Sequence, residues 1–331
     1  MTSGEHCRAL GAVKVAVLLT SVKRRALRHA LELKLRRCRG DMLQHFLGDV
    51  MTKVHGDNFV RASAFYSQGD LKCDGLLRNP LTVFACYGPN NGGDGLSTVA
   101  LAKAVSKVAE DFNGAVKHWP DLKQWIFVSN FVSGVPPHIT QEVMKLQKAN
   151  PNRSLKLLGL EQFEKIILDL ELDDIEDLIG DAATDEDFRQ IQIPEVQSVI
   201  DDVMAAVTDG VVRDDQPIEV PAEKLEFNKL PAIYCNRLKQ GFQSAGRVAT
   251  YLLDHPDPTL DGRMAGAFKG KYLELKAQGF LPGEIMDELY DFALGGHRNT
   301  TPREVAVWGL LAHLFEKCTI FEDDPSKVVA A

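Results

Sequence analysis

The sequence contains no run of about 18 apolar residues, so it predicts no membrane-spanning helix. Its six cysteines form no C-x-x-C pair, which argues against both a disulfide framework and a cysteine-based zinc module. The nine histidines include no H-E-x-x-H motif, and the G-x-S-x-G motif of many serine hydrolases does not occur. These absences favour a reduced, cytoplasmic protein without a zinc centre.

Charge is distributed unevenly along the chain. The 331 residues carry a formal net charge of −8, but residues 1–40 carry ten Lys and Arg against two Glu, so the remainder sums to −16. An acidic body argues against a protein that coats nucleic acid with most of its surface. A basic N-terminal face could still contact phosphates, and the residues predicted to do so are Arg24, Arg25, Arg28, Arg36, Arg37 and Arg39.

The length predicts about two domains. Residues 1–23 are interpreted as a disordered leader rather than a signal peptide, because Lys14 interrupts the apolar stretch 11–22 and basic residues follow it. The predicted segments after the leader are an α/β domain at 24–180, an acidic joint and linker with a helix at 181–230, and a helical C-terminal domain at 231–322.

Hydrophobic spacing predicts mixed helices and strands in the first half of the chain. A helix over 24–55 is interrupted at Gly40-Asp41, where Asp41 is expected to cap the second part. The later elements are strands at 59–65, 75–77, 81–87, 125–128 and 155–158, and helices at 97–112, 137–149 and 162–170. This order indicates a mixed sheet flanked by helices.

The second half is interpreted as an acidic joint followed by helices. Ten acids and no Lys or Arg occupy residues 169–187, a composition typical of a solvated helix face or a linker. Proline and glycine then separate four helical stretches, at 231–255, 260–278, 282–294 and 302–321. The predicted fold class is therefore α+β, with a mixed sheet and an all-α C-terminal domain.

The loop before the most strand-like segment, LTVFACY, is the main candidate site. Asp70 and Asp74 lie four residues apart in this loop, and Lys72 lies between them. Two such carboxylates could bind a hard cation such as Mg²⁺, and a lysine could offset the charge that develops on a phosphate. The alternative is that the two aspartates only shape a tight turn, because Asp and Gly are common turn residues.

A helix followed by this hairpin resembles the restriction-endonuclease-like fold, in which a hairpin Asp, commonly before Gly, precedes a Glu-x-Lys triplet on the next strand. Asp74-Gly75 matches the Asp position, but Ala85 and Tyr87 stand where Glu and Lys are expected. Tyr87 can form hydrogen bonds but carries no positive charge at pH 7. If the domain is an enzyme, the resemblance implies Asp74 as a ligand of Mg²⁺, and Asp70 is expected to assist it. Two replacements for the missing strand residues are open: Lys72 could reach the site from the loop, which makes Asp70-Leu71-Lys72 a displaced acid-x-lysine pair, or Asp41 on the preceding helix could supply the missing carboxylate as a metal ligand. The candidate catalytic residues are therefore Asp74, Asp70 and Lys72, with Tyr87 as a positioning group.

Several stretches together resemble proteins of bacterial ABC-three-component conflict systems. They include RGDMLQHFLGDVM, QGDLKCDG, VFACYGP, AQGFLPGEIMDELYDFALGG and TPREVAVWGLLAHLFEKCTIFE, and the similarity spans roughly residues 30–322. Such systems pair an ABC-type ATPase with a small middle component and an effector protein. The resemblance implies a role in defence against phages or plasmids.

Two functional hypotheses follow. In the first, a nuclease-like domain acts on DNA or RNA, and the helical C-terminal domain couples it to the ABC-type ATPase and the middle component. In the second, the nuclease fold is degenerate and the protein is a non-enzymatic adaptor that links the ATPase to the other components. Cleavage that depends on Mg²⁺ distinguishes the two hypotheses.

Overall fold

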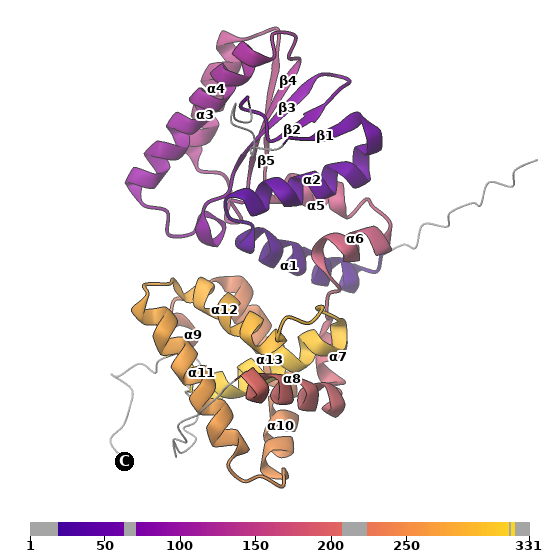
Figure 1. Cartoon of the computed structure of the whole chain (residues 1–331), viewed down its shortest axis with the longest axis vertical. Coiled ribbons are helices and arrows are strands. Elements are labelled where there is room, and N and C mark those ends of the chain that lie inside the picture. The colour runs from indigo at the N-terminus through magenta and orange to yellow at the C-terminus, as the bar shows by residue number, and fades with distance from the viewer. Residues whose placement is uncertain (1–18, 63–70, 207–223, 318, 322–331) are drawn as a thin grey trace, which may run out of the picture.

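The computed structural model describes residues 19–62, 71–206, 224–317 and 319–321, which form an α/β region and a helical C-terminal region (Figure 1). Of the leader predicted over residues 1–23, the part up to residue 18 lies outside the described residues. The chain is helical from Ser21 onward, because the hydroxyl of Thr20 accepts the N–H of Lys23 (3.2 Å) and caps the first turn.

The predicted interruption at residue 40 separates two helices, α1 (Ser21–Arg37) and α2 (Asp41–His55). Gly40 adopts φ +51° and ψ −128°, a backbone conformation that residues with a Cβ rarely adopt. The prediction that Asp41 caps α2 was wrong, because Gly40 is the N-cap and Asp41 is the first helical residue. The N–H of Gly40 donates to the carbonyl of Gly88 (2.8 Å), which places the start of α2 beside the end of a central strand.

The mixed sheet expected from the order of elements is present, with strand order β1-β2-β3-β4-β5. The strands are β1 (Phe59–Arg61), β2 (Gly75–Leu77), β3 (Thr82–Tyr87), β4 (Gln124–Ser129) and β5 (Ser154–Leu158). Strands β1, β2 and β3 are antiparallel neighbours, whereas β3, β4 and β5 run parallel. The strand predicted over 59–65 ends at Arg61, and residues 63–65 lie outside the described part of the chain.

Two layers of helices cover the sheet. Helices α3 (Thr98–His118) and α4 (Pro137–Ala149) lie on one face, and α1, α2 and α5 (Leu160–Ile167) lie on the other (Figure 1). Side chains alternate between the two faces along a strand. In β3, Val83 and Ala85 therefore pack under α3, whereas Phe84 joins the core under α1 and α2.

The acidic run over residues 169–187 forms two short helices, α6 (Leu172–Ile179) and α7 (Asp185–Arg189). The apolar side chains of α6 are buried in the same core as α1 and α2. The C-terminal core begins at Ala183 and includes the apolar side chain of α7. The run is therefore a packed joint of amphipathic helices, one for each core, and the C-terminal core starts well before the predicted residue 231.

The helical C-terminal region is built around a central helix. Its described helices are α8 (Ile193–Ala206), α9 (Lys224–Phe227), α10 (Ala232–Leu253), α11 (Leu260–Ala277), α12 (Pro282–Leu294) and α13 (Thr301–Glu316). Helix α13 is buried on all sides from Arg303 to Phe315, so the other helices pack around it. None of the helices that the structure describes has both the length and the apolar character needed to cross a membrane.

Charged side chains join the two regions where α1 meets α12. Arg37, in the last turn of α1, donates to Asp287 (2.8 Å) and Asp291 (3.0 Å). The hydroxyl of Tyr234 on α10 donates to the other oxygen of Asp287 (2.7 Å). The basic first helix thus neutralises acids that belong to the protein itself.

Asp181 links α1 to the start of α13. Burial would raise the pKa of this carboxyl, but hydrogen bonds from Lys23, Thr301 and the N–H of Ala182, together with the charge of Lys23, hold its pKa at about 2. Since the ordinary value is 3.8, ionised Asp181 stabilises the fold above about pH 4, and this contribution is lost as the pH falls through about 2.

We expect the free energies of unfolding of the wild type and Asp181→Asn to converge as the pH falls from about 5 to about 2, as measured by urea denaturation. Asp173→Asn changes an exposed acid of the same run and is the matched control. Its free energy of unfolding should differ from that of the wild type by no more than about 0.5 kcal/mol. A constant difference for Asp181→Asn over this range would contradict the stabilising role.

Candidate functional site

A cavity of about 370 Å³ lies between the start of α2, the loop before β2, the end of β3 and one face of α3. Four residues predicted from the sequence line it together: Asp41, Lys72, Asp74 and Tyr87. The other lining residues are Gly40, Gln44, Ala85, Cys86, Gly88, Lys107 and Asp111. The sequence-based prediction missed Lys107 and Asp111, because only the fold brings α3 over this loop.

Asp74 is positioned by the hairpin of β2 and β3. Its N–H donates to the carbonyl of Phe84 (2.8 Å), and its Oδ2 accepts the N–H of Cys86 (2.6 Å). The carboxylate therefore supports the hairpin, as the turn interpretation expects, and it also lines the cavity. Burial and the charge of Asp74 raise the pKa of the Cys86 thiol, which argues against a catalytic thiolate.

A buried carboxylate binds both lysines of the cavity. Asp111 of α3 is 2% exposed, and its two oxygens accept hydrogen bonds from Lys72 (2.9 Å) and Lys107 (2.5 Å). A buried carboxylate is costly unless cations compensate its charge, and here two do so. The two lysines therefore supply positive charge beside the end of β3, the central strand.

The strand positions where Glu and Lys were expected line this cavity. Ala85 contributes only a methyl group. Burial raises the pKa of Tyr87, and the charge of Lys107 opposes this effect only in part, so the hydroxyl is neutral at pH 7 and can donate a hydrogen bond. The positive charge that β3 lacks comes instead from the loop and from α3.

Two carboxylates among the described residues, Asp41 and Asp74, could offer oxygen ligands to Mg²⁺. The described ranges contain no group of three or more His, Cys, Asp or Glu side chains placed to hold a metal ion. The third predicted ligand, Asp70, lies outside the described residues. Mg²⁺ often takes one or two carboxylates and completes its shell with waters and substrate phosphates, so two carboxylates that line one cavity are enough in number for such a site.

The six arginines predicted to contact phosphates fall into two groups. Arg28, Arg36 and Arg37 are paired within the protein, with Glu164 (2.6 Å), Asp94 (2.7 Å) and Asp287 (2.8 Å) respectively. Only 4% of the Arg36 side chain is exposed, so the prediction that it contacts phosphates was wrong. Within the described part of the chain, no acid forms an ion pair with Arg24, Arg25 or Arg39, and these three stay candidates.

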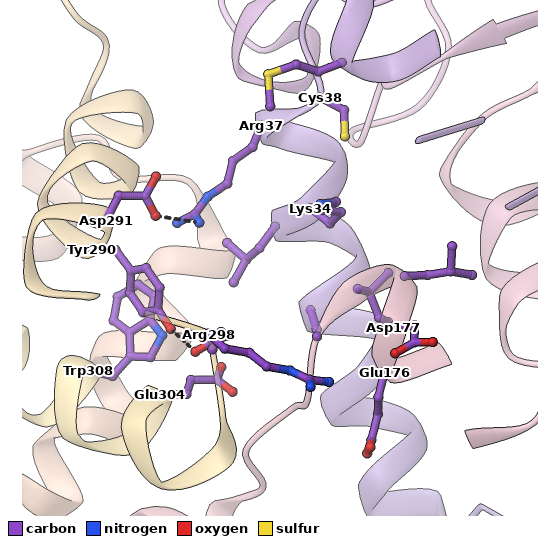
Figure 2. A pocket seen from close by; sticks show the side chains of 17 residues that line it. Lys34, Arg37, Cys38, Glu176, Asp177, Tyr290, Asp291, Arg298, Glu304 and Trp308 are labelled. Atoms are coloured by element: carbon purple, nitrogen blue, oxygen red, sulfur yellow. Dashed lines mark hydrogen bonds and ion pairs between the residues drawn. The ribbon is translucent and has the colours of Figure 1, made fainter. Parts of the chain in front are cut away.

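A larger cavity of about 530 Å³ separates α1 and α6 from α12 and α13. Figure 2 shows Arg37 reaching Asp291 at one end of it and Arg298 extending into it from the C-terminal region. Arg37 also lies over the ring of Tyr290, 5.1 Å from its centroid. Both contacts of Arg37 join the α/β region to the C-terminal region. We therefore interpret this cavity as part of the interface between the two regions.

One comparison identifies the C-terminal region. Residues 194–322 match C-terminal domain 10 of the ABC-three component (ABC-3C) systems, a segment that starts in α8 and includes the central helix α13. The match supports membership in an ABC-three component system, and the α/β region with its cavity lies outside it. No curated protein and no solved structure matches the chain.

Proposed function

We propose that the protein belongs to an anti-phage or anti-plasmid defence complex, in which the α/β region acts on nucleic acid and the helical C-terminal region binds partner proteins. The match to an ABC-three component domain supports this setting, with an ABC-type ATPase and a small middle component as partners. One observation supports the activity: carboxylates, lysines and Tyr87 from separate elements converge on a single cavity.

The cavity offers the groups that hydrolysis of a phosphodiester requires. Asp74 and Asp41 would hold Mg²⁺, which when bound activates water and neutralises phosphate oxygens. Lys72 carries positive charge that would stabilise the negative charge developing on the phosphate. Tyr87 can donate a hydrogen bond to a phosphate oxygen. The proposed activity is therefore that of a nuclease whose catalytic lysine lies in the loop before β2 instead of on β3.

We expect the protein, alone or with its ATPase partner, to cleave plasmid DNA or single-stranded RNA with Mg²⁺ or Mn²⁺, and Asp74→Asn to abolish cleavage in a gel assay. Asparagine can still accept the N–H of Cys86, so the variant keeps the hairpin and loses the charge. Asp57→Asn, at an exposed turn before β1, is the control and should cleave at the wild-type rate. Undiminished cleavage by Asp74→Asn would refute the assigned role.

A non-enzymatic adaptor is the second candidate function. It is favoured by Ala85, which supplies no ligand, and by Asp74, whose carboxylate already serves the hairpin. An adaptor requires Asp74→Asn to keep full phage resistance in a plaque assay. Changes on the exposed surface of the C-terminal helices, such as Leu253→Ser at an 85% exposed position, should then abolish resistance.

A further inference from the structure

The backbone of the loop before β2 adopts an unfavourable conformation at Lys72 and at the residue before it. Leu71 and Lys72 adopt φ +54° and +58°, in the left-handed region. Such conformations are unfavourable for leucine and lysine and persist where surrounding contacts compensate for them. Two consecutive residues of this kind indicate that the position of the Lys72 side chain is strongly determined.

Helix α3 is shaped to receive this side chain. A Cβ at Gly114 would lie 2.5 Å from Cγ of Lys72. Because Gly114 has no side chain, the Lys72 side chain can pass across the helix at this position. One turn earlier on the same helix, Asp111 accepts the Lys72 ammonium, and its other oxygen accepts Lys107. Backbone conformation, a glycine and a buried carboxylate thus all favour one position for Lys72.

The result is a pair of ammonium groups held close together at the wall of the cavity. Asp111 is buried, whereas the Lys72 and Lys107 side chains are 43% and 39% exposed. The carboxylate between them offsets the repulsion of two like charges. An ammonium carries three donors, so a lysine that binds Asp111 can also donate to an anion in the cavity.

We propose that Lys72 and Lys107 form a two-lysine site for a phosphate of the nucleic acid backbone, and that Asp111 is the positioning residue that sets their spacing. This inference rests on the proposed action on nucleic acid and deepens it by adding Lys107 as a phosphate contact. Asp111 does not touch the nucleic acid, and it acts through the two lysines.

The first test is binding of a fluorescently labelled single-stranded DNA oligonucleotide by the full chain, measured by anisotropy without divalent metal at several salt concentrations. Lys107→Ala should weaken binding on the order of tenfold and lower the slope of log affinity against log salt by about 0.7, because one phosphate contact is lost. Lys117→Ala, at an exposed position on the same helix away from the cavity, is the matched control and should bind like the wild type.

The variant Asp111→Asn tests whether Asp111 positions the two lysines or whether the lysines act only through their charge. The change makes the protein more positive by one unit, so lysines that acted only as charges would bind DNA more tightly. A positioning role predicts several-fold weaker binding in spite of that added charge, with partial recovery in Asp111→Glu. Circular dichroism and thermal unfolding establish that each variant is folded, and the comparison of Lys107→Ala with Lys117→Ala stands even if the Asp111 variants do not fold.

The three measurements test three separate claims: the two-lysine site, the positioning role of Asp111, and the proposed function. Equal binding by Lys107→Ala and Lys117→Ala would overturn the two-lysine site and leave the proposed function standing. Equal or tighter binding by folded Asp111→Asn would overturn the positioning role. A wild-type protein that binds neither this DNA oligonucleotide nor a single-stranded RNA of the same length at low salt would contradict the proposed function itself, and the two-lysine site with it.

Discussion

Replacing Arg237 with alanine is expected to destabilise the protein by about 3–5 kcal/mol, the usual cost of leaving one charge of a buried pair without its partner. The Arg237 side chain is fully buried in α10, and its Nη2 lies 3.1 Å from an oxygen of Glu304, which is also buried. Glu304 accepts the N–H of Ala183 as well (2.8 Å), so the pair fixes α10 and α13 to the joint between the two regions. Burial raises the pKa of Glu304 and the charge of Arg237 opposes this, so loss of the arginine favours the protonated acid.

The measurement is urea denaturation followed by circular dichroism at neutral pH. Arg247→Ala removes an exposed arginine from the same helix and should change the free energy of unfolding by no more than about 0.5 kcal/mol. Arg237→Met combined with Glu304→Gln should recover most of the loss, because no buried charge is left and glutamine can still accept the N–H of Ala183. A loss below about 1 kcal/mol in Arg237→Ala would show that the pair is not buried as described.

Gly241→Ala is expected to destabilise the protein by about 1–3 kcal/mol or more, even though alanine is the better helix former. A Cβ at this position would lie 2.4 Å from the carbonyl oxygen of Trp308, which is backbone and cannot move aside cheaply. The contact is where α10 crosses the central helix α13. Separation of the two helices would loosen the C-terminal core to which both contribute buried side chains.

Helix α10 contains a second glycine, at which alanine should have the opposite effect on stability. Gly246 has no atom within 4 Å of the position that a Cβ would take, so Gly246→Ala should stabilise the fold by about 0.5–1 kcal/mol through backbone entropy alone. Thermal unfolding of the two variants should therefore shift in opposite directions. Shifts of the same sign would mean that α10 does not cross α13 at Gly241.

Features with local signals could be predicted from the sequence. Helices α4 and α12 match their predicted ranges, because each has proline at the first helical position and an apolar stripe behind it. Lys72, Asp74 and Tyr87 belong to one hairpin and the loop that leads into it, so spacing along the chain was enough to group them as a candidate site.

Features that depend on distant segments could not be predicted in this way. Asp111 binds a lysine 39 positions away. It is one of two adjacent acids in an Ala- and Lys-rich helix, and nothing in that pattern indicates which of the two is buried. Arg36 belongs to a stretch that is basic in sequence, and its partner Asp94 lies 58 positions away. Composition describes the charge of a segment, whereas only the fold determines which charges neutralise one another.

The pairing of Arg37 with Asp287 across 250 positions has an evolutionary consequence. An N-terminal region exchanged between relatives by recombination would have to bring a cation at the end of its first helix, or leave the acids of α12 facing a surface that does not neutralise them. The two positions should therefore change together among related chains, with a reversed or neutral pair in place of a mismatched one. Inheritance of the α/β region and of the C-terminal region would then be linked in part through this contact.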